Sequence, residues 1–419
     1  MVRAETLPSG MRFITETMPH VRSVSLGVWL LRGSRHESDE QSGIAHFIEH
    51  MLFKGTEHRS ARDIAQEIDS IGGQLDAFTA KEYAGYYLKV LDEHLPVAVD
   101  LLSDMVLRPA FQPDDIEREQ GVILEEIKMV EDAPDDLVHE VLAQQFWPSH
   151  PLGRPILGTP ESVGSFTQAG LRRYFGETYV APQLLIAAAG NLDHDRLKDL
   201  VLRVFASAPA GVVVNGMAPP RVAAGLSHRQ KDIEQSHVCL ATPAYHQAHV
   251  DRHALYVLNT ILGGSMSSRL FQHIREERGL AYAVFSTLAA YSDAGMFTVY
   301  AGCASERVPE VVDLALREMR GLRDVAVPAD ELRRAKDHLK GSLMLNLEST
   351  SSRMSHLARQ SMFFERTFTL DEIIAAIEGV TAVAVQQVAK ELFQDEGLAA
   401  TVVGPAASSA LPGPLSLSR

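Results

Sequence analysis

The sequence predicts an α+β protein made of two similar domains in tandem. Three observations support this prediction. The chain has 419 residues, more than one ordinary domain. Strand and helix patterns occur in runs instead of strict alternation, and the two halves of the chain resemble each other. With 46% hydrophobic and 22% charged residues, the composition is that of a globular protein. We therefore expect each domain to be a mostly antiparallel sheet covered by helices.

The elements of the first half follow from local patterns. Alternating apolar residues indicate a strand, and the pair Ser60 and Asp63 forms a capping box before an apolar helical stripe. Two β-rich runs separated by a short turn predict a hairpin. The expected elements, in order, are a strand at 24–30, a helix after Ser60, a hairpin at 74–79 and 83–91, and helices at 93–107 and 114–131.

The second half repeats the first in three places. A helix pattern with matching Pro, Val, Asp and Leu residues occurs in both halves, and so do an apolar helix pattern and a strand of small residues that ends in glycine. The paired segments are 95–105 with 308–319, 43–55 with 252–264, and 184–190 with 398–404. A duplicated domain explains all three pairs.

The boundary between the halves lies in a segment of unusual composition. Residues 206–228 are rich in Ala, Pro and Gly and carry almost no charge. We expect a first domain at 1–210, a linker at 211–228, a homologous second domain at 229–405, and a frayed tail at 406–419.

Composition excludes several classes of function. The net charge of −15 disfavours nucleic acid and anionic lipid surfaces. No apolar run reaches the ~18 residues of a membrane span, and the N-terminus lacks the apolar core of a secretion signal. Cys239 and Cys303 are too few for a disulfide framework and are read as two buried thiols. The expected location is the cytoplasm.

The strongest chemical signal is the string His46-Phe-Ile-Glu49-His50. On a helix, two histidines four residues apart lie on one face and can share a metal ion. Glu49 would lie beside them, within reach of a water at that metal. Such a string arises by chance often enough that a further ligand is needed to decide.

Two carboxylates qualify as that further ligand. Glu119 and Glu126 lie seven residues apart on the expected 114–131 helix and therefore on one face, beside its apolar stripe. Glu125 points elsewhere and is read as a solvated neighbour. The spacing alone does not choose between Glu119 and Glu126.

The internal repeat gives an independent argument for a site in the first half only. Near the motif positions the second half has Tyr256, Asn259 and Thr260, and its 330–346 helix places Ala335 and Ser342 roughly where the two glutamates stand. The scaffold is retained while the ligands are absent. A generic surface helix would not explain this difference.

These segments resemble a known family. LPSGMRFITETMPHVRSVSLGVWLLRGSRHESDEQSGIAHFIEHMLFKGT is similar to the N-terminal signature of the pitrilysin, insulysin and mitochondrial processing peptidase family, the inverzincins, in a half-length bacterial-type form. The similarity continues through GGQLDAFTAKE, EREQGVILEEI and FGETYVAPQLLIAAAGNLD to SRLFQHIREERGLAYAVFS.

The resemblance assigns roles to individual residues. It implies that His46, His50 and Glu126 bind one Zn²⁺ per chain and that Glu49 is the general base. Glu119 would steady the site from behind. The zinc site would have three protein ligands and one position open for water.

Two further groups of residues are implied to bind substrate. Arg275 and Tyr282, seven residues apart in the second half, would hydrogen-bond the substrate carbonyl and the oxyanion that develops from it. Asp76, Ala77 and Phe78 lie on the strand that would pair with an extended peptide. Asp76 stands where family members usually have Asn, which leaves its side-chain contact open, whereas backbone pairing is expected unchanged.

The resemblance therefore implies a zinc metalloendopeptidase that hydrolyses unfolded peptides or presequence-like segments. A chain of this length would form half of a closed, clamshell-like chamber, and a homodimer is expected to complete it. Two alternatives stay open: a non-catalytic core or scaffold subunit, and the catalytic half of a heterodimer.

Overall fold

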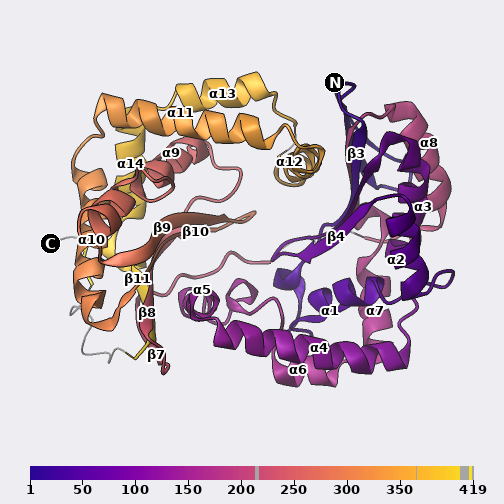
Figure 1. The fold of residues 1–419 in the computed structure, drawn as a ribbon, viewed down its shortest axis with the longest axis horizontal. Helices are drawn as coiled ribbons and strands as arrows, with labels where there is room; N and C mark the ends of the chain where they lie inside the picture. Colours follow the sequence, from indigo (N-terminus) through magenta and orange to yellow (C-terminus); the bar gives the residue numbers. More distant parts are fainter. Residues whose placement is uncertain (213–216, 365, 406–414, 418–419) are drawn as a thin grey trace. The chain divides into compact units, whose positions relative to one another are not determined.

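The computed structural model describes residues 1–212, 217–364, 366–405 and 415–417. They form two compact units, and each consists of one sheet with helices packed on it (Figure 1). The first unit comprises Met1–Lys128, Arg154–Met217 and Leu345–Thr367, and the second comprises Met129–Gly153, Ala218–Met344 and Phe368–Arg419. The α+β class with two tandem domains is thus confirmed.

The first unit has a six-stranded sheet in the order β1-β2-β6-β3-β5-β4. Only the β2–β6 pair is parallel, and β4 lies at one edge. The predicted hairpin is β4 and β5, and the strand predicted at 24–30 is β3. The strands are β1 (Val2–Thr6), β2 (Arg12–Thr17), β3 (Ser23–Leu30), β4 (Gln74–Thr79), β5 (Ala84–Leu91) and β6 (Leu184–Gly190).

Alternation along β3 explains how this sheet is covered. The apolar residues at even-numbered positions of β3 pack into the large core, together with the helices from the His46–His50 string onward. Trp29 belongs to a smaller core on the opposite face. The helices of this unit are α1 (Ile44–Leu52), α2 (Ala61–Ser70), α3 (Leu95–Leu107), α4 (Pro113–Asp132), α6 (Pro160–Ser165), α7 (Gln168–Thr178), α8 (His194–Val204) and α12 (Thr350–Phe363).

The second unit has a five-stranded sheet in the order β7-β11-β8-β10-β9. The β7–β11 pair is parallel and the other pairs are antiparallel. Its strands are β7 (Gly225–Gln230), β8 (Gln235–Ala244), β9 (Ala281–Ala290), β10 (Gly295–Ala304) and β11 (Ala399–Gly404). Its helices are α5 (Pro134–Phe146), α9 (Arg252–Leu262), α10 (Val308–Asp324), α11 (Ala329–Asn346), α13 (Leu370–Glu378) and α14 (Ala382–Leu392).

The predicted contiguous domains 1–210 and 229–405 need one correction, because each half of the chain gives a helix to the other unit. α5 of the first half packs on β11 and β8, and α12 of the second half packs on β6 and β3. Each exchanged helix supplies the apolar residues that cover one sheet face, including Leu142 in α5 and Leu357 in α12. A boundary read from linker composition does not reveal this exchange.

The structure also departs in part from the predicted linker at 211–228 and the predicted tail at 406–419. The strand β7 begins at Gly225, so the end of the predicted linker belongs to a sheet. In the tail, Leu417 is fully buried in the second core and its N–H donates to Asp395. Residues 213–216, 406–414 and 418–419 lie outside the described part of the chain.

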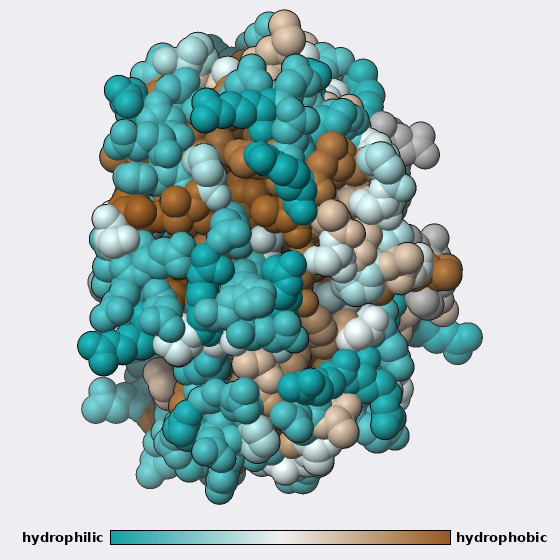
Figure 2. Space-filling view, turned by 90° about the vertical axis from the view of Figure 1, so that its right-hand side faces the viewer, coloured by the Kyte–Doolittle hydropathy of each residue, from teal (hydrophilic) through white to brown (hydrophobic). Residues whose placement is uncertain are grey.

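The surface shown in Figure 2 is mostly hydrophilic, with apolar residues in narrower areas between. Both cysteines are buried free thiols, as predicted. Among the described helices, none is by itself long and apolar enough to cross a membrane, and α13 with α14 would do so only as a pair bent by 84°.

Candidate metal centre

The helix α1, which carries the motif, begins at a constrained glycine. Gly43 has φ of +91°, and a Cβ at this position would lie 2.6 Å from Leu157 O. The buried carboxylate of Glu37 accepts hydrogen bonds from the backbone N–H groups of Gly43 (2.8 Å) and Ala45 (2.9 Å). A negative group at a helix N-terminus satisfies free donors and favours the helix dipole. These contacts hold the start of α1 in place.

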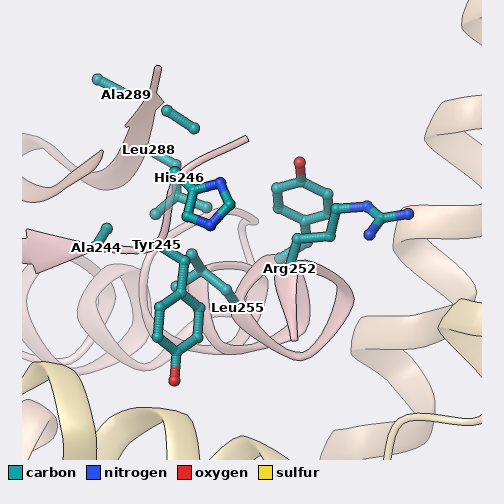
Figure 3. Close-up of a pocket in the computed structure, with 9 residues that line it drawn as sticks. Ala244, Tyr245, His246, Arg252, Leu255, Leu288 and Ala289 are labelled. Atoms are coloured by element: carbon teal, nitrogen blue, oxygen red, sulfur yellow. The ribbon is translucent and has the colours of Figure 1, made fainter. Parts of the chain in front are cut away.

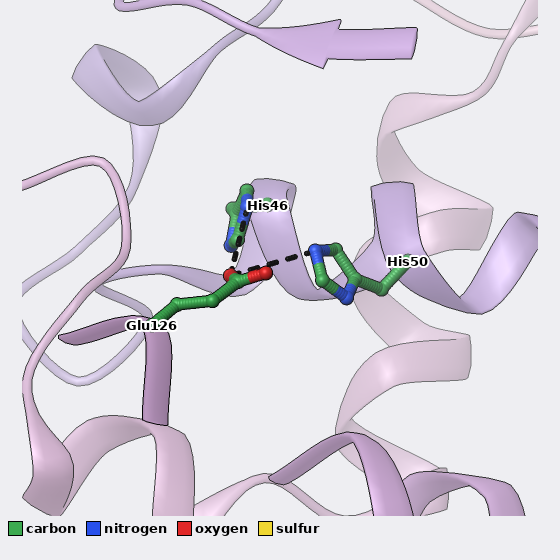
Figure 4. A group of neighbouring side chains, drawn as sticks. All are labelled: His46, His50 and Glu126. Carbon is green, nitrogen blue, oxygen red and sulfur yellow. Dashed lines mark ion pairs between the residues drawn. The ribbon is translucent and has the colours of Figure 1, made fainter. Parts of the chain in front are cut away.

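The structure brings His46, His50 and Glu126 together (Figure 4). Their nearest ligand atoms all lie within 4.8 Å of one another. Glu126 Oε2 is 3.8 Å from His46 Nε2 and 3.7 Å from His50 Nε2. These distances are too long for hydrogen bonds, so the carboxylate faces both rings without bonding to either.

Glu119 occupies a different place from Glu126. It is 3% exposed, and its Oε2 accepts a hydrogen bond from His50 Nδ1 at 3.0 Å. Its other oxygen accepts from the Lys54 ammonium at 2.6 Å. Because a carboxylate only accepts, this contact places the His50 proton on Nδ1 and leaves Nε2 free on the side of Glu126.

Glu49 points to the pocket beside the histidines. The hydroxyl of Thr79 on β4 donates to Glu49 Oε2 at 2.5 Å. Burial raises the pKa of the Glu49 carboxyl above its ordinary value, while the hydrogen bond from Thr79 opposes that shift. A carboxylate with a raised pKa and one free oxygen is suited to accept a proton near neutral pH.

The three clustered residues fit a zinc ion. Two ligand atoms at the usual ~2.0–2.1 Å from a tetrahedral Zn²⁺ lie about 3.4 Å apart. The distances from Glu126 Oε2 to the Nε2 atoms of His46 and His50, 3.8 and 3.7 Å, are close to this value. Burial, assisted by the neighbouring His50, lowers the pKa of His46 to about 4. The ring is therefore uncharged at pH 7 and can bind a metal ion through a nitrogen lone pair. His46 Nδ1 is buried without a hydrogen-bond partner among the described residues. The cluster is the only group of metal-ligating side chains at such distances in the described part of the chain.

The cluster opens onto a pocket with a free volume of about 280 Å³. Its lining comes from α1, the turn after it and the edge strand β4. The lining residues are Glu49, His50, Phe53, Lys54, Asp76 and Ala77. The pocket offers room beside His50 and Glu49 for a segment of peptide.

Asp76, Ala77 and Phe78 lie on β4, which has a partner strand on one side only. Asp76 is exposed, and its two carboxylate oxygens accept from Ala77 N (2.8 Å) and from the Tyr87 hydroxyl (3.0 Å). The Ala77 N–H therefore already donates to the Asp76 side chain, while backbone pairing of Ala77 and Phe78 with a substrate stays a prediction.

Arg275 and Tyr282 both lie in the second unit and contact each other. Arg275 belongs to a π-helical turn, Phe271–Glu276, and its guanidinium lies 4.7 Å from the centre of the Phe271 ring and 5.2 Å from that of Tyr282. Tyr282 is 80% exposed on the edge strand β9. The pair thus offers a guanidinium and a phenol side by side.

The equivalent helix pair of the second unit lines a much smaller cavity. Thr260 and Ala335 line a cavity of only about 10 Å³, next to a bidentate ion pair between Arg269 and Glu331 (2.8 and 2.9 Å). A further second-unit pocket, between His246, Arg252 and Leu288, is equally small (Figure 3). Such volumes hold about one water molecule.

Sequence reasoning missed three residues that support the first-unit site: Glu37, Lys54 and Thr79. Lys54 follows His50 by four residues, so helical spacing could have suggested a contact with the same partner. Glu37 is an acid ahead of a helix start, which is a weak signal. Thr79 is joined to Glu49 by tertiary packing, for which the local sequence gives no signal.

Comparison with known protein families decides the relationship. A model described as Insulinase (Peptidase family M16) matches residues 12–160, and one described as Peptidase M16 inactive domain matches residues 165–339. The chain belongs to peptidase family M16. The resemblance noted from the sequence is confirmed, and the second domain model matches the half that lacks the ligand cluster.

Several M16 relatives match along 90% or more of their length. A Bacillus subtilis protein named "Uncharacterized zinc protease YmxG" is 43% identical over 94% of this chain and 97% of its own. A Streptomyces coelicolor protein named "Uncharacterized zinc protease SCO5738" is 40% identical over 96% and 90%. The chain is therefore a half-length, bacterial-type M16 member.

Solved structures show the same fold. A Pseudomonas fluorescens structure titled as a peptidase M16 inactive domain superposes with a TM-score of 0.92 at 21% identity, covering 97% of this chain and 98% of that one. A protease from Helicobacter pylori gives 0.89, also at 21% identity, over 97% and 99%. At this identity the likeness concerns the M16 fold alone.

Proposed function

We propose that this M16 protein is a zinc-dependent metalloendopeptidase that cleaves unfolded peptides. The observation that carries the proposal is the cluster of His46, His50 and Glu126 with Glu49 beside it. The names of the curated relatives as zinc proteases support it. One Zn²⁺ per chain, held by these three residues, is part of the proposal.

The residues of this chain have distinct roles in the reaction. Zinc in such a site acts as a Lewis acid and makes water acidic enough to deprotonate near neutral pH. Glu49 accepts the proton of the attacking water and returns it to the leaving amine. Glu119 and Lys54 hold His50 in the orientation that presents Nε2 to the cluster. Thr79 fixes one oxygen of Glu49 and leaves the other for the proton.

The substrate binds as an extended strand along β4, with its scissile bond in the pocket beside Glu49. Unfolded peptides fit this mode because a free edge strand pairs only with an extended backbone. Arg275 and Tyr282 supply hydrogen-bond donors to the substrate carbonyl and its oxyanion. The paired arrangement of these two side chains supports that role.

The proposed assembly is a cytoplasmic homodimer that encloses the sites in a chamber. A closed interior would exclude folded proteins and admit unfolded segments. In this assembly the Arg275–Tyr282 pair of one chain would complete the site at the ligand cluster of its partner. The alternatives are a heterodimer, or a subunit that serves as a scaffold.

Removal and replacement of the metal tests the proposal. The protein is stripped with a chelator, and cleavage of an unstructured peptide of about 20–30 residues is followed by mass spectrometry before and after zinc is added. The proposal predicts internal cleavage that is lost with the metal and returns with one zinc per chain. A zinc-loaded dimer that leaves every such peptide intact would contradict it and favour the scaffold.

A further inference from the structure

The pocket side of β4 holds a feature that bears on substrate entry. Asp76 lies one residue before Ala77, and both line the pocket beside Glu49 and His50. In the described structure the carboxylate of Asp76 accepts from its neighbour's N–H at 2.8 Å and from the Tyr87 hydroxyl at 3.0 Å. Both oxygens are thus engaged within the same hairpin.

The N–H of Ala77 faces the free edge of the sheet. At the hairpin turn, Ala80 N donates to Tyr83 O at 2.8 Å. Ladder hydrogen bonds in an antiparallel pair recur every second residue, so with the observed register the bonded residues of β4 are Phe78 and Asp76. Ala77 lies between them and turns its N–H away from β5.

An added strand needs this N–H. An extended peptide on β4 would accept from outward-facing N–H groups, and Ala77 provides one of them beside the pocket. Asp76 is a competitor for that donor because a carboxylate accepts more strongly than a peptide carbonyl. Tyr87 strengthens the competition, since its hydroxyl holds the carboxylate in the capping position.

We propose that Asp76 is a gate on the edge strand: its carboxylate withholds the Ala77 N–H until a peptide displaces it. This inference rests on the proposed function. Displacing the Asp76 carboxylate adds the same free-energy cost to the binding of every extended peptide. A peptide that pairs only weakly with β4 then does not bind, whereas one that makes several further favourable contacts does. Asp76 acts on peptide entry.

Hydrogen exchange in the peptide-free protein tests the hydrogen bond between Asp76 and the Ala77 N–H without any proteolysis. We expect the Ala77 amide to exchange at least about fivefold faster in Asp76→Ala than in the wild type, with Asp76→Asn between them because an amide oxygen is a neutral acceptor. Asp195→Ala is the matched control, because it removes an exposed carboxylate of the same unit far along the sequence. Equal exchange in the wild type and Asp76→Ala would overturn the proposal.

Peptide affinity tests the gate itself. In a Glu49→Gln background, which prevents cleavage, Asp76→Ala should bind an unstructured peptide about three- to tenfold more tightly, and Tyr87→Phe should shift affinity in the same direction by less. Unchanged or weaker binding by Asp76→Ala would overturn the gate. If exchange accelerates but neither protein binds peptide, the proposed function fails and the gate with it, although the Asp76–Ala77 hydrogen bond stands.

Discussion

The two units build related folds and use the same pair of helices differently. In the first unit α1 and α4 bring two histidines and a carboxylate together, and one of these histidines, His50, lines a pocket of about 280 Å³. In the second, α9 and α11 present Thr260 and Ala335 to a cavity of about 10 Å³ beside the Arg269–Glu331 ion pair. The shared fold therefore does not by itself create the site. The side chains at a few helix positions, with the space around them, make one unit a candidate catalyst.

Loss of a ligand should give the largest difference between the units. We expect His46→Ala to abolish stoichiometric zinc binding and to lower peptide cleavage by at least about a thousandfold. Thr260→Val, a change at the corresponding position of the second unit, should leave zinc binding and peptide cleavage unchanged. Zinc content measured by atomic absorption, together with cleavage rates, checks this. Retained zinc in His46→Ala would place the metal elsewhere.

The exchanged helices allow a matched test of stability. Leu357 in α12 and Leu142 in α5 are buried on the sheet face that each helix covers. Each change to Ala should cost about 2–5 kcal/mol of unfolding free energy. Hydrogen exchange should show Leu357→Ala loosening the first unit and Leu142→Ala loosening the second. Loosening of the opposite unit in either case would contradict the exchange.

The contact behind His50 should have a smaller effect. Glu119→Gln removes the charged acceptor that orients His50 and pairs with Lys54, and we expect zinc affinity to fall about 10–100-fold. Glu125→Gln is the control, because Glu125 is exposed and pairs only with Lys128 among the described residues. Competition with a zinc chelator measures both. Equal affinities for the two variants would remove Glu119 from the site.

The buried Glu37 at the start of α1 should give the smallest effect near pH 7 and a larger one at lower pH. Burial raises the pKa of Glu37 to about 7, so the folded state binds its proton more tightly than the unfolded state does. The contribution of Glu37 to stability is then greatest below pH ~4.5 and declines by up to ~3 kcal/mol as the pH rises to about 7. Unfolding free energies of the wild type and Glu37→Gln should therefore converge or cross as the pH rises over this range. A constant difference would contradict the raised pKa.

Local patterns predicted the elements that carry the site. The histidine spacing, the 74–79 and 83–91 hairpin and the long helix with two glutamates all appear as α1, β4, β5 and α4. Spacing could not separate Glu119 from Glu126, because both lie on one face of α4. Only tertiary packing shows that one reaches the back of His50 and the other faces both rings.

What the sequence could not reveal depends on contacts between distant segments. The exchange of α5 and α12 depends on which sheet face lacks a cover, and the apolar stripe of a helix does not name its partner. The Thr79 contact to Glu49 spans 30 residues. The capping of Ala77 by Asp76 depends on which N–H groups of β4 face outward, and that follows from the hairpin register.

The most direct test of the central claim compares the wild type with Glu49→Gln at equal zinc occupancy. Both proteins are loaded with one zinc per chain and given the same unstructured peptide. The account predicts that the wild type cleaves internal peptide bonds and that Glu49→Gln retains its zinc but cleaves at least about a hundredfold more slowly. Equal cleavage by the two proteins, or none by the zinc-loaded wild type, would contradict it.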